Sequence, residues 1–393
     1  MTKKIYMDYA ATTPVDSRVL RLMLPYFSEK FGNATALYFF GQEAKAALEE
    51  SRGQVSSLIG AKANEIIFTS SATESNNLAF KGIALANRKK GRHIIISPIE
   101  HPSIMESAKW LEKQGFKITR LPVDKYGLVN LDNLKKAIKK NTILVSVIHA
   151  SNEIGTIQPI KEIGEAIKRK SETLNLKSKI YFHTDAVQSF GKIPIDVNKM
   201  KIDLLSASSH KMYGPKGTAC LFVREGVCIE PILHGGGQES GLRPSTVNVS
   251  AIVGFGMACK ICKREMKKEA QKQIKLRDKL IKGVLEKIPG SRLNGHLQKR
   301  LPNNINFRFE FVEGESMVVQ LDLSGIAVST GSACATAKLE PSYVLLAIGL
   351  KHEQAHGSLR LTLGRWTKES EINYLLKLLP GIIKRLREIS GKT

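Results

Sequence analysis

Cysteine is scarce in this chain of 393 residues, which has five cysteines and two tryptophans. A small, odd number of cysteines argues against a disulfide framework and favours reduced thiols inside the cell. The sequence has no apolar run near the roughly 18 residues that a membrane helix needs. Residues 1–8 also lack the apolar core of a secretory signal. These absences predict a cytoplasmic protein that has no contact with a membrane.

Acidic residues are far fewer than basic ones, with 36 Asp+Glu against 60 Lys+Arg and a formal net charge of +24. Such a surface attracts anions, including nucleic acids and acidic proteins. The densest basic cluster, at residues 263–272, has few interleaved aromatic residues, which weakens a nucleic-acid interpretation. We interpret the charge mainly as a solvated surface and expect no direct nucleic-acid binding, with salt-sensitive tRNA binding as the alternative.

Short apolar runs alternate with longer amphipathic ones through the first two thirds of the chain. Buried apolar strands that alternate with helices indicate an α/β fold with a mostly parallel sheet of seven strands between helices. The predicted strands are residues 65–69, 93–97, 117–122, 142–148, 180–184, 203–207 and 218–223. The predicted helices between them are residues 73–89, 102–114, 131–139 and 160–170.

The pattern changes after residue 253. A long basic helix is predicted at residues 258–287, followed by an alternating strand at 303–309 and a final helix at 369–389. This order predicts a smaller α+β domain at the C-terminal end. We assign residues 15–258 to the large domain, and residues 1–14 and 259–393 to the small one.

Polar residues gather where the predicted strands end. In an open parallel sheet, ligands bind beyond the carboxyl ends of the strands. The segments that follow five of the predicted strands therefore form one predicted site: residues 70–75, 100–101, 151–155, 183–188 and 208–211.

Three features of this predicted site suit one cofactor. Lys211 lies in a polar turn, where a lysine can form a Schiff base with an aldehyde. Asp185 ends a strand, and a carboxylate there can keep a pyridine nitrogen protonated. Ala72 and Thr73 begin a helix whose backbone N–H groups can hold a phosphate. Aldehyde, ring nitrogen and phosphate are the functional groups of pyridoxal 5′-phosphate (PLP).

The same segments resemble the class V, fold-type I PLP-dependent enzymes. The resemblance rests on DYAATTP at residues 8–14, FTSSATE at 68–74, NEIG at 152–155, HTDAVQ at 183–188, SSHKMYGPKG at 208–217 and HGGG at 234–237. STGSAC at 329–334 and LEPSY at 339–343 resemble the cysteine desulfurases of the NifS/IscS type. That family removes sulfur from L-cysteine to give L-alanine and an enzyme persulfide.

The resemblance implies roles for particular residues toward the cofactor. Lys211 would bind PLP covalently and later move a substrate proton, Asp185 would pair with the ring nitrogen, and Gln188 would bind the phenolic oxygen. His101 would stack on the ring and act as an acid or base. The phosphate would be held by Ala72, Thr73, Ser208 and His210, and, from the neighbouring subunit of a homodimer, by Thr246.

The resemblance also assigns the substrate and the sulfur. Asn152 and Arg360 would hold the carboxylate of L-cysteine, for which a guanidinium is well shaped. Cys334, on a loop of the small domain, would attack the sulfur as a thiolate and carry the persulfide. No metal is expected. The acceptor stays open between an iron–sulfur scaffold, a tRNA-thiolation protein and a thiamine-pathway partner.

The chain departs from the family pattern in two places. Residues 34–38 read Ala-Thr-Ala-Leu-Tyr where the family has a proline and a following histidine near the substrate entrance. Pro244 and Ser245 stand where the family has a glycine before the threonine that corresponds to Thr246. These changes bear on the substrate site and on the phosphate contact between subunits.

Two other interpretations of the whole chain compete with the desulfurase. Another class V PLP enzyme, a selenocysteine lyase or an aminotransferase, would have no need of Cys334. A basic interaction protein could keep the fold without chemistry, although intact Lys211 and Asp185 argue against it. The spacing of Cys259 and Cys262 permits a metal or redox pair, but without a second ligand pair we expect plain packing.

Overall fold

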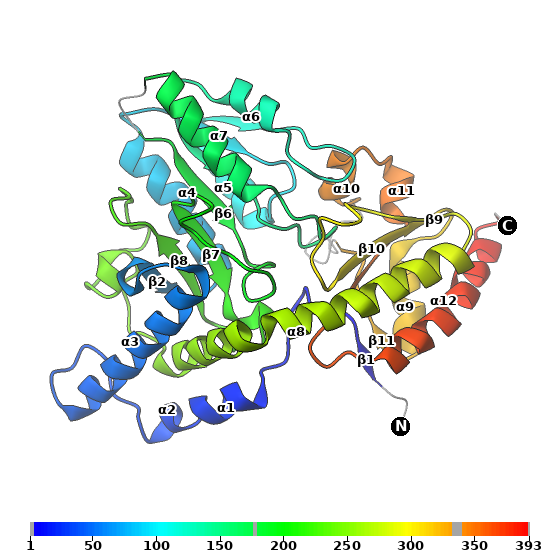
Figure 1. Ribbon diagram of the computed structural model, residues 1–393, viewed down its shortest axis with the longest axis horizontal. Helices are drawn as coiled ribbons and strands as arrows, with labels where there is room; N and C mark the ends of the chain where they lie inside the picture. The colour runs from blue at the N-terminus through cyan, green and yellow to red at the C-terminus, as the bar shows by residue number, and fades with distance from the viewer. Residues whose placement is uncertain (1–3, 176–178, 332–339, 392–393) are drawn as a thin grey trace.

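The structure is a computed structural model that describes residues 4–175, 179–331 and 340–391. Cys334 lies outside these residues. Two groups of β-strands divide the chain in space, a large sheet on one side and smaller sheets on the other (Figure 1). Among the described residues, no helix is both long and apolar enough to cross a membrane.

The large sheet has seven strands in the order β2-β8-β7-β6-β5-β3-β4. Six strands run parallel, and β8 is antiparallel to its neighbours β2 and β7. The predicted mostly parallel, seven-stranded sheet is therefore confirmed. The strands are β2 Ile66–Thr69, β3 His93–Ile96, β4 Lys117–Arg120, β5 Thr142–Ser146, β6 Tyr181–Asp185, β7 Leu204–Ser208 and β8 Ala219–Val223.

Helices cover both faces of this sheet because successive side chains of a strand point to opposite faces. Ile94 and Ile96 pack on one side against α4 and α5, whereas Ile95 packs on the other with residues of α3, α7 and α8. The helices of this part are α1 Ser17–Met23, α2 Pro25–Ser28, α3 Phe39–Ile59, α4 Ala72–Asn87, α5 Pro102–Lys113, α6 Leu131–Ala137 and α7 Ile160–Thr173. Three short 3₁₀ turns are η1 Ala63–Glu65, η2 Ser209–Lys211 and η3 Glu239–Gly241.

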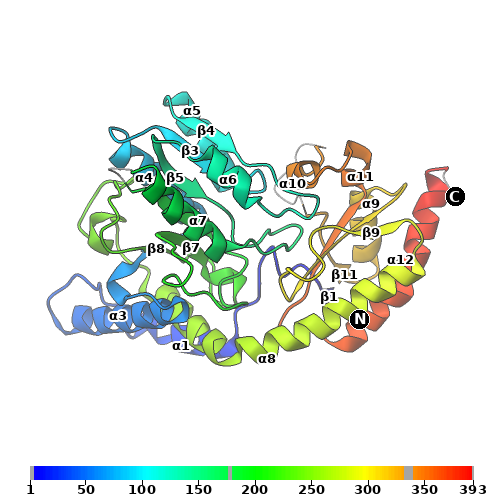
Figure 2. The same ribbon diagram turned by 45° about the horizontal axis from the view of Figure 1, so that its top comes forward.

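Helix α8, Val249–Lys287, is 39 residues long and runs from the large sheet to the small ones (Figures 1 and 2). It begins at residue 249, so the predicted start at residue 258 is wrong. Its first turns are apolar and buried between α3 and α1, and they lack the amphipathic pattern that marks the rest of the helix. The predicted domain boundary between residues 258 and 259 falls inside this helix and stays a prediction.

The remainder of the chain forms two small sheets. Strands β9 Ser291–Leu293, β10 Asn304–Phe309 and β12 Ser358–Thr362 make an antiparallel sheet, while β1 Ile5–Tyr6 pairs in parallel with β11 Ile326–Ala327. The helices of this part are α9 Gly314–Leu323, α10 Tyr343–Ala347, α11 His352–His356 and α12 Glu369–Ile389. Apolar residues of the small sheets pack against α9, α12 and the second half of α8. This second core holds β12, and with it Arg360, opposite the large sheet.

A histidine in the middle of the large sheet is held in its neutral form. His183 on β6 contacts Ser146 Oγ through Nδ1 at 2.9 Å and Ser206 Oγ through Nε2 at 3.1 Å. Complete burial lowers the pKa of His183 from 6.5 to about 3. Because the unfolded chain binds a proton at this residue below about pH 6.5 and the folded chain does not, His183 makes stability fall as the pH falls.

We expect His183→Gln to remove this part of the pH dependence. Below pH 6.5, the wild-type chain loses about 1.4 kcal/mol of unfolding free energy per pH unit through His183 alone. The difference in unfolding free energy between wild type and variant, measured in urea, should therefore shrink between pH 7.0 and pH 5.5. An equal difference at both pH values would contradict a neutral His183 in the folded state.

Candidate active site

A cavity of about 380 Å³ lies between the carboxyl edge of the large sheet and strand β12. Four parallel strands, β3, β5, β6 and β7, end at this edge, and the N-terminal segment and the C-terminal part of the chain close it. The structure brings together most of the predicted site residues here. Those that line the cavity are Ala72, Thr73, His101, Asn152, Asp185, Gln188, His210, Lys211 and Arg360.

Asp185, the last residue of β6, is held by two donors. The Val187 backbone N–H donates to Oδ1 at 3.0 Å, and Asn76 Nδ2 donates to Oδ2 at 2.7 Å. The same Asn76 amide also donates to Ser103 Oγ at 2.8 Å. The carboxylate thus has a fixed direction at the edge of the sheet, as a partner for a ring nitrogen requires.

His101 caps helix α5 and is neutral in this site. The Ser103 backbone N–H donates to His101 Nδ1 at 3.2 Å, so the ring carries its proton on Nε2. Burial lowers the pKa of His101, with Asp185 opposing and Lys211 reinforcing that shift. A neutral ring at the cavity wall can stack on an aromatic ligand and exchange a proton with a bound substrate.

Lys211 ends the short turn η2 that follows β7, opposite the N-terminal segment. Its Nζ donates to the carbonyl oxygens of Ala10 at 2.6 Å and Ala11 at 2.5 Å. Gln188 Nε2 donates to the same Ala10 oxygen at 3.0 Å. The N-terminal segment therefore holds the ammonium group at the cavity, close to the glutamine amide.

One end of the cavity suits a phosphate. Ala72 and Thr73 begin α4, and the first N–H groups of a helix have no partner within it. His210 lies close by, with Nδ1 at 3.1 Å from Thr12 Oγ1, and burial lowers its pKa to about 4. Ser208 ends β7 next to this turn but does not line the cavity, and Thr246 lies on the surface outside it.

The other end of the cavity suits a carboxylate. Arg360 on β12 is buried; its Nη2 donates to Asp8 Oδ1 at 2.8 Å and its Nη1 to the Asn152 carbonyl at 3.1 Å. Its Nε has no partner among the residues that the structure describes. A buried guanidinium with an unpaired N–H is a site for an anionic ligand, since leaving the group unpaired costs free energy.

Two contacts join the C-terminal part of the chain to the loops of the large sheet. Ser342 Oγ donates to Glu153 Oε2 at 2.5 Å, and Tyr343 Oη donates to the Glu100 carbonyl at 2.5 Å. Complete burial raises the pKa of Glu153 to about 7, with Ser342 and Arg360 opposing that shift. These contacts fix the chain just beyond residues 332–339, and Cys334 lies in that range, outside the described residues.

Several side chains that orient the predicted site residues are not among the residues predicted from the sequence. Asn76 lies one helical turn after Ala72 and Thr73, a spacing that places it on the same face of α4 and that could have identified it. Asp8 begins the motif at residues 8–14, but the motif alone indicates no role for its side chain. Ser103 gave no signal, because its contacts with Asn76 and His101 depend on how α4 and α5 pack.

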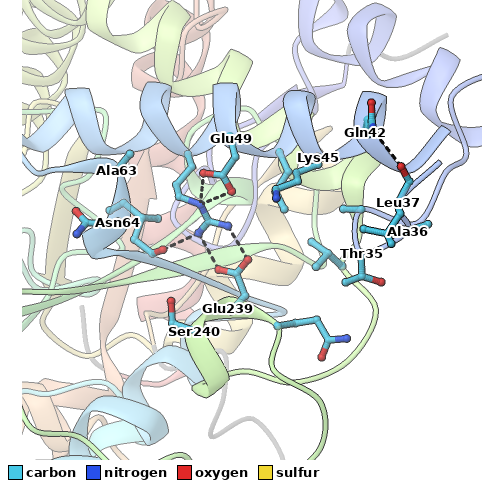
Figure 3. Close-up of a pocket in the computed structure, with 16 residues that line it drawn as sticks. Thr35, Ala36, Leu37, Gln42, Lys45, Glu49, Ala63, Asn64, Glu239 and Ser240 are labelled. Atoms are coloured by element: carbon cyan, nitrogen blue, oxygen red, sulfur yellow. Dashed lines mark hydrogen bonds and ion pairs between the residues drawn. The ribbon is translucent and has the colours of Figure 1, made fainter. Parts of the chain in front are cut away.

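The departure at residues 34–38 lies at a different cavity. Thr35, Ala36 and Leu37 line a cavity of about 860 Å³ between α3 and η3 (Figure 3). Its wall contains a buried ion pair in which Arg52 Nη2 contacts Glu239 Oε1 at 2.7 Å. The described structure therefore places these residues away from the cavity that Lys211 lines.

The described residues fit PLP. A fixed carboxylate, a lysine, a neutral histidine and the N-terminus of α4 line one cavity, and together they suit its ring nitrogen, aldehyde, ring face and phosphate. The unpaired Nε of Arg360 leaves a donor for the carboxylate of an amino acid. A metal site is not indicated, because no group of metal-ligating side chains occurs among the described residues.

Comparisons with known proteins agree with this chemistry. The family model described as aminotransferase class-V matches residues 5–375. The cysteine desulfurase IscS 1 of Archaeoglobus fulgidus is 52% identical over 385 residues, which cover 98% of each chain. The chain therefore belongs to the class-V aminotransferase family, and within it to the cysteine desulfurases.

Solved structures agree in fold. A structure titled as a NifS-like protein superposes with a TM-score of 0.90 at 38% sequence identity. The match covers 97% of this chain and 100% of that chain. Another, titled SspA in complex with cysteine, has a TM-score of 0.81 at 35% identity and covers 93% of this chain and 100% of that chain.

These findings confirm the predicted family, fold class, enzyme class and PLP cofactor. The roles of individual residues stay predictions, although most of those residues line one cavity.

We expect Asn76→Ala to weaken PLP binding about tenfold to hundredfold. The reason is the loss of a hydrogen bond to a charged group, which contributes about 1.5–3 kcal/mol. The measurement is the PLP dissociation constant of the reconstituted protein. Asn87→Ala, which removes a buried amide at the far end of α4, is the control and should lower stability without changing that constant.

Ser245 is strained, with a φ of 101°, where side chains other than glycine are disfavoured. Ser245→Gly should raise the unfolding free energy by about 1 kcal/mol, because relief of strain exceeds the entropy that glycine adds to the unfolded chain. Ser57→Gly, at an exposed position in the last turn of α3, should have the opposite sign. Thermal and urea unfolding measure both, and a destabilised Ser245→Gly protein would refute the strain.

Proposed function

We propose that this enzyme removes the sulfur atom from L-cysteine, releases L-alanine and holds the sulfur as a persulfide on Cys334. The observation that most supports this proposal is that Lys211, Asp185 and Arg360 line the same cavity. Lys211 and Asp185 lie at the edge of the large sheet, and Arg360 faces them from β12. Bound PLP supplies an electron sink that weakens the bonds around the substrate Cα.

The chain's residues would hold the cofactor at separate points. We assign Lys211 to the aldehyde carbon, Asp185 to the ring nitrogen, Gln188 to the phenolic oxygen and His101 to the ring face. The phosphate is assigned to Ala72, Thr73, Ser208 and His210, which lie at or beside the N-terminus of α4. Contacts at five points fix both the position and the tilt of the ring.

The substrate would be oriented by its carboxylate. Arg360 Nε, which has no partner among the described residues, is the donor for that carboxylate. Asn152, whose backbone carbonyl accepts a hydrogen bond from Arg360 Nη1, also lines the cavity. Once the substrate replaces Lys211, the released amine is the group that takes the proton from Cα. Neutral His101, which also lines the cavity, can accept or donate a second proton.

Sulfur transfer is assigned to Cys334. Its thiolate attacks the sulfur of the bound cysteine, the S–S bond forms as the Cβ–S bond breaks, and a proton from the site is added at Cβ. The other cysteines of the described residues do not suit this role. Cys220, Cys259 and Cys262 are buried and their pKa values are raised by burial, while Cys228 is exposed and away from the cavity.

The partners are part of the same proposal. Thr246 is exposed and outside its own chain's cavity, which suits a contact with the phosphate of a second copy and hence a homodimer. The persulfide would pass, in the cytoplasm, to an acceptor protein that serves iron–sulfur cluster assembly, tRNA thiolation or cofactor thiolation. Trapping the Cys334 persulfide with its acceptor in a pull-down would identify which.

Cys334→Ser should abolish sulfide release from L-cysteine in the presence of a reductant, because no thiolate remains to accept the sulfur. Cys228→Ser, which replaces an exposed cysteine, is the matched control and should keep full activity. Full sulfide release by Cys334→Ser would overturn the persulfide mechanism.

Lys211→Ala should give a colourless protein, since the covalent attachment of PLP is lost. Its absorbance spectrum after reconstitution with PLP, compared with the yellow wild-type protein, is the measurement. A wild-type protein that stays colourless after reconstitution would favour a non-catalytic interaction protein.

A further inference from the structure

Lys192 is a buried lysine that the proposed reaction does not use. It follows β6 by a short turn and is 8% exposed. Keeping a lysine in the interior costs free energy unless its amine makes specific contacts. An apolar side chain of similar length would fill the same space at a lower cost, so the contacts of the amine indicate its purpose.

Among the described residues, the amine of Lys192 forms hydrogen bonds with one residue, Gln188. Its Nζ donates to the Gln188 carbonyl oxygen at 3.0 Å and lies 3.4 Å from Gln188 Oε1. At the other end of the same amide, Gln188 Nε2 donates to the Ala10 carbonyl at 3.0 Å. That carbonyl also accepts a hydrogen bond from Lys211 Nζ.

These contacts select one orientation of the Gln188 amide. A glutamine side chain can rotate by half a turn and exchange its oxygen with its nitrogen. Lys192 Nζ only donates when it is charged, and the Ala10 carbonyl only accepts. Both therefore require Oε1 to face Lys192 and the NH₂ group to face the cavity.

The surroundings of Lys192 make this contact its main polar interaction. The charged or titratable groups that act on it are Lys211 and His210 on η2, and Glu269 and Cys262 on α8. On its other side it lines a cavity of about 580 Å³ with Lys263, Lys267 and Arg300. Burial, and after it Lys211, lowers the pKa of Lys192 to about 7. A neutral amine can accept as well as donate, so Lys192 selects one orientation of the Gln188 amide while it is charged, below about pH 7.

We propose that Lys192 is a positioning residue that locks the Gln188 amide with its N–H group directed at the phenolic oxygen of bound PLP. The inference rests on the proposed function, in which Gln188 binds that oxygen. Without Lys192, only the Ala10 carbonyl holds this orientation, so the amide turns its oxygen toward the phenolic oxygen, another acceptor, in a larger fraction of the molecules. A correctly directed donor stabilises negative charge on the phenolic oxygen and so favours the less protonated form of the bound cofactor.

The test is the pH titration of the visible absorbance of reconstituted protein, which reports the protonation of bound PLP without turnover. Lys192→Met keeps the length of the side chain and removes the donor. We expect the titration midpoint to rise by about one pH unit, the size of one directed hydrogen bond. Lys192→Arg, which keeps a donor, should bring the midpoint back toward that of wild type.

A double-mutant cycle separates positioning from a direct effect of the lysine charge. If Lys192 acts through Gln188, then Lys192→Met should shift the midpoint by less than about 0.2 pH unit in a Gln188→Ala background. An equal shift in both backgrounds would overturn the inference in favour of a direct charge effect, and an unchanged midpoint in Lys192→Met would overturn it outright.

Two controls keep the result specific. Lys179→Met removes a lysine that contacts Asp203 away from the cavity, and it should leave the midpoint unchanged. Should Lys192→Met fail to fold, Lys192→Gln carries the same test with a shorter side chain. A wild-type protein that takes up no PLP would overturn the proposed function as well, whereas a normal wild-type titration with an unshifted variant overturns only the role of Lys192.

Discussion

The common direction of four neighbouring strands is the constraint on which this site depends. Because β3, β5, β6 and β7 run parallel, the segments that follow them emerge at one edge of the sheet. His101, Asp185 and Lys211 come from distant parts of the sequence and meet only for that reason. The sheet is buried on both faces, so its edge is the place where polar groups can face a ligand without weakening the core.

A second constraint is the link between the two groups of sheets. The long helix α8 packs on the large sheet at its start and on the small antiparallel sheet at its end. The N-terminal segment crosses the same gap, with Ile5–Tyr6 paired to β11 and the carbonyls of Ala10 and Ala11 against Lys211. Arg360 therefore faces the sheet edge at a fixed place, and the two ends of an amino-acid substrate can be held by different parts of the chain.

Burial sets the charge of many groups in the site, and it does so in opposite directions for acids and bases. It lowers the pKa values of His101 and His210 and raises that of Glu153 to about 7. These three groups are thus held near or in their neutral forms, while Asp185 keeps two donors. Burial also determines the proposed role of Lys192, because this buried donor holds the side-chain amide of Gln188 in one orientation.

The sequence by itself determined the class of the protein, since apolar periodicity gave the order of strands and helices, and motifs at the strand ends gave Lys211, Asp185 and the family. Those signals are local in the sequence, so they can be recognised without knowing how the elements pack. Only the tertiary structure decided which side chains orient these residues. Asn76 against Asp185, Asp8 against Arg360 and Lys192 against Gln188 are contacts between separate elements or across a turn, and their geometry depends on how those elements pack. The start of α8 at residue 249 belongs to the same group, because tertiary burial extended the helix through turns whose apolar residues carry no helical pattern of their own.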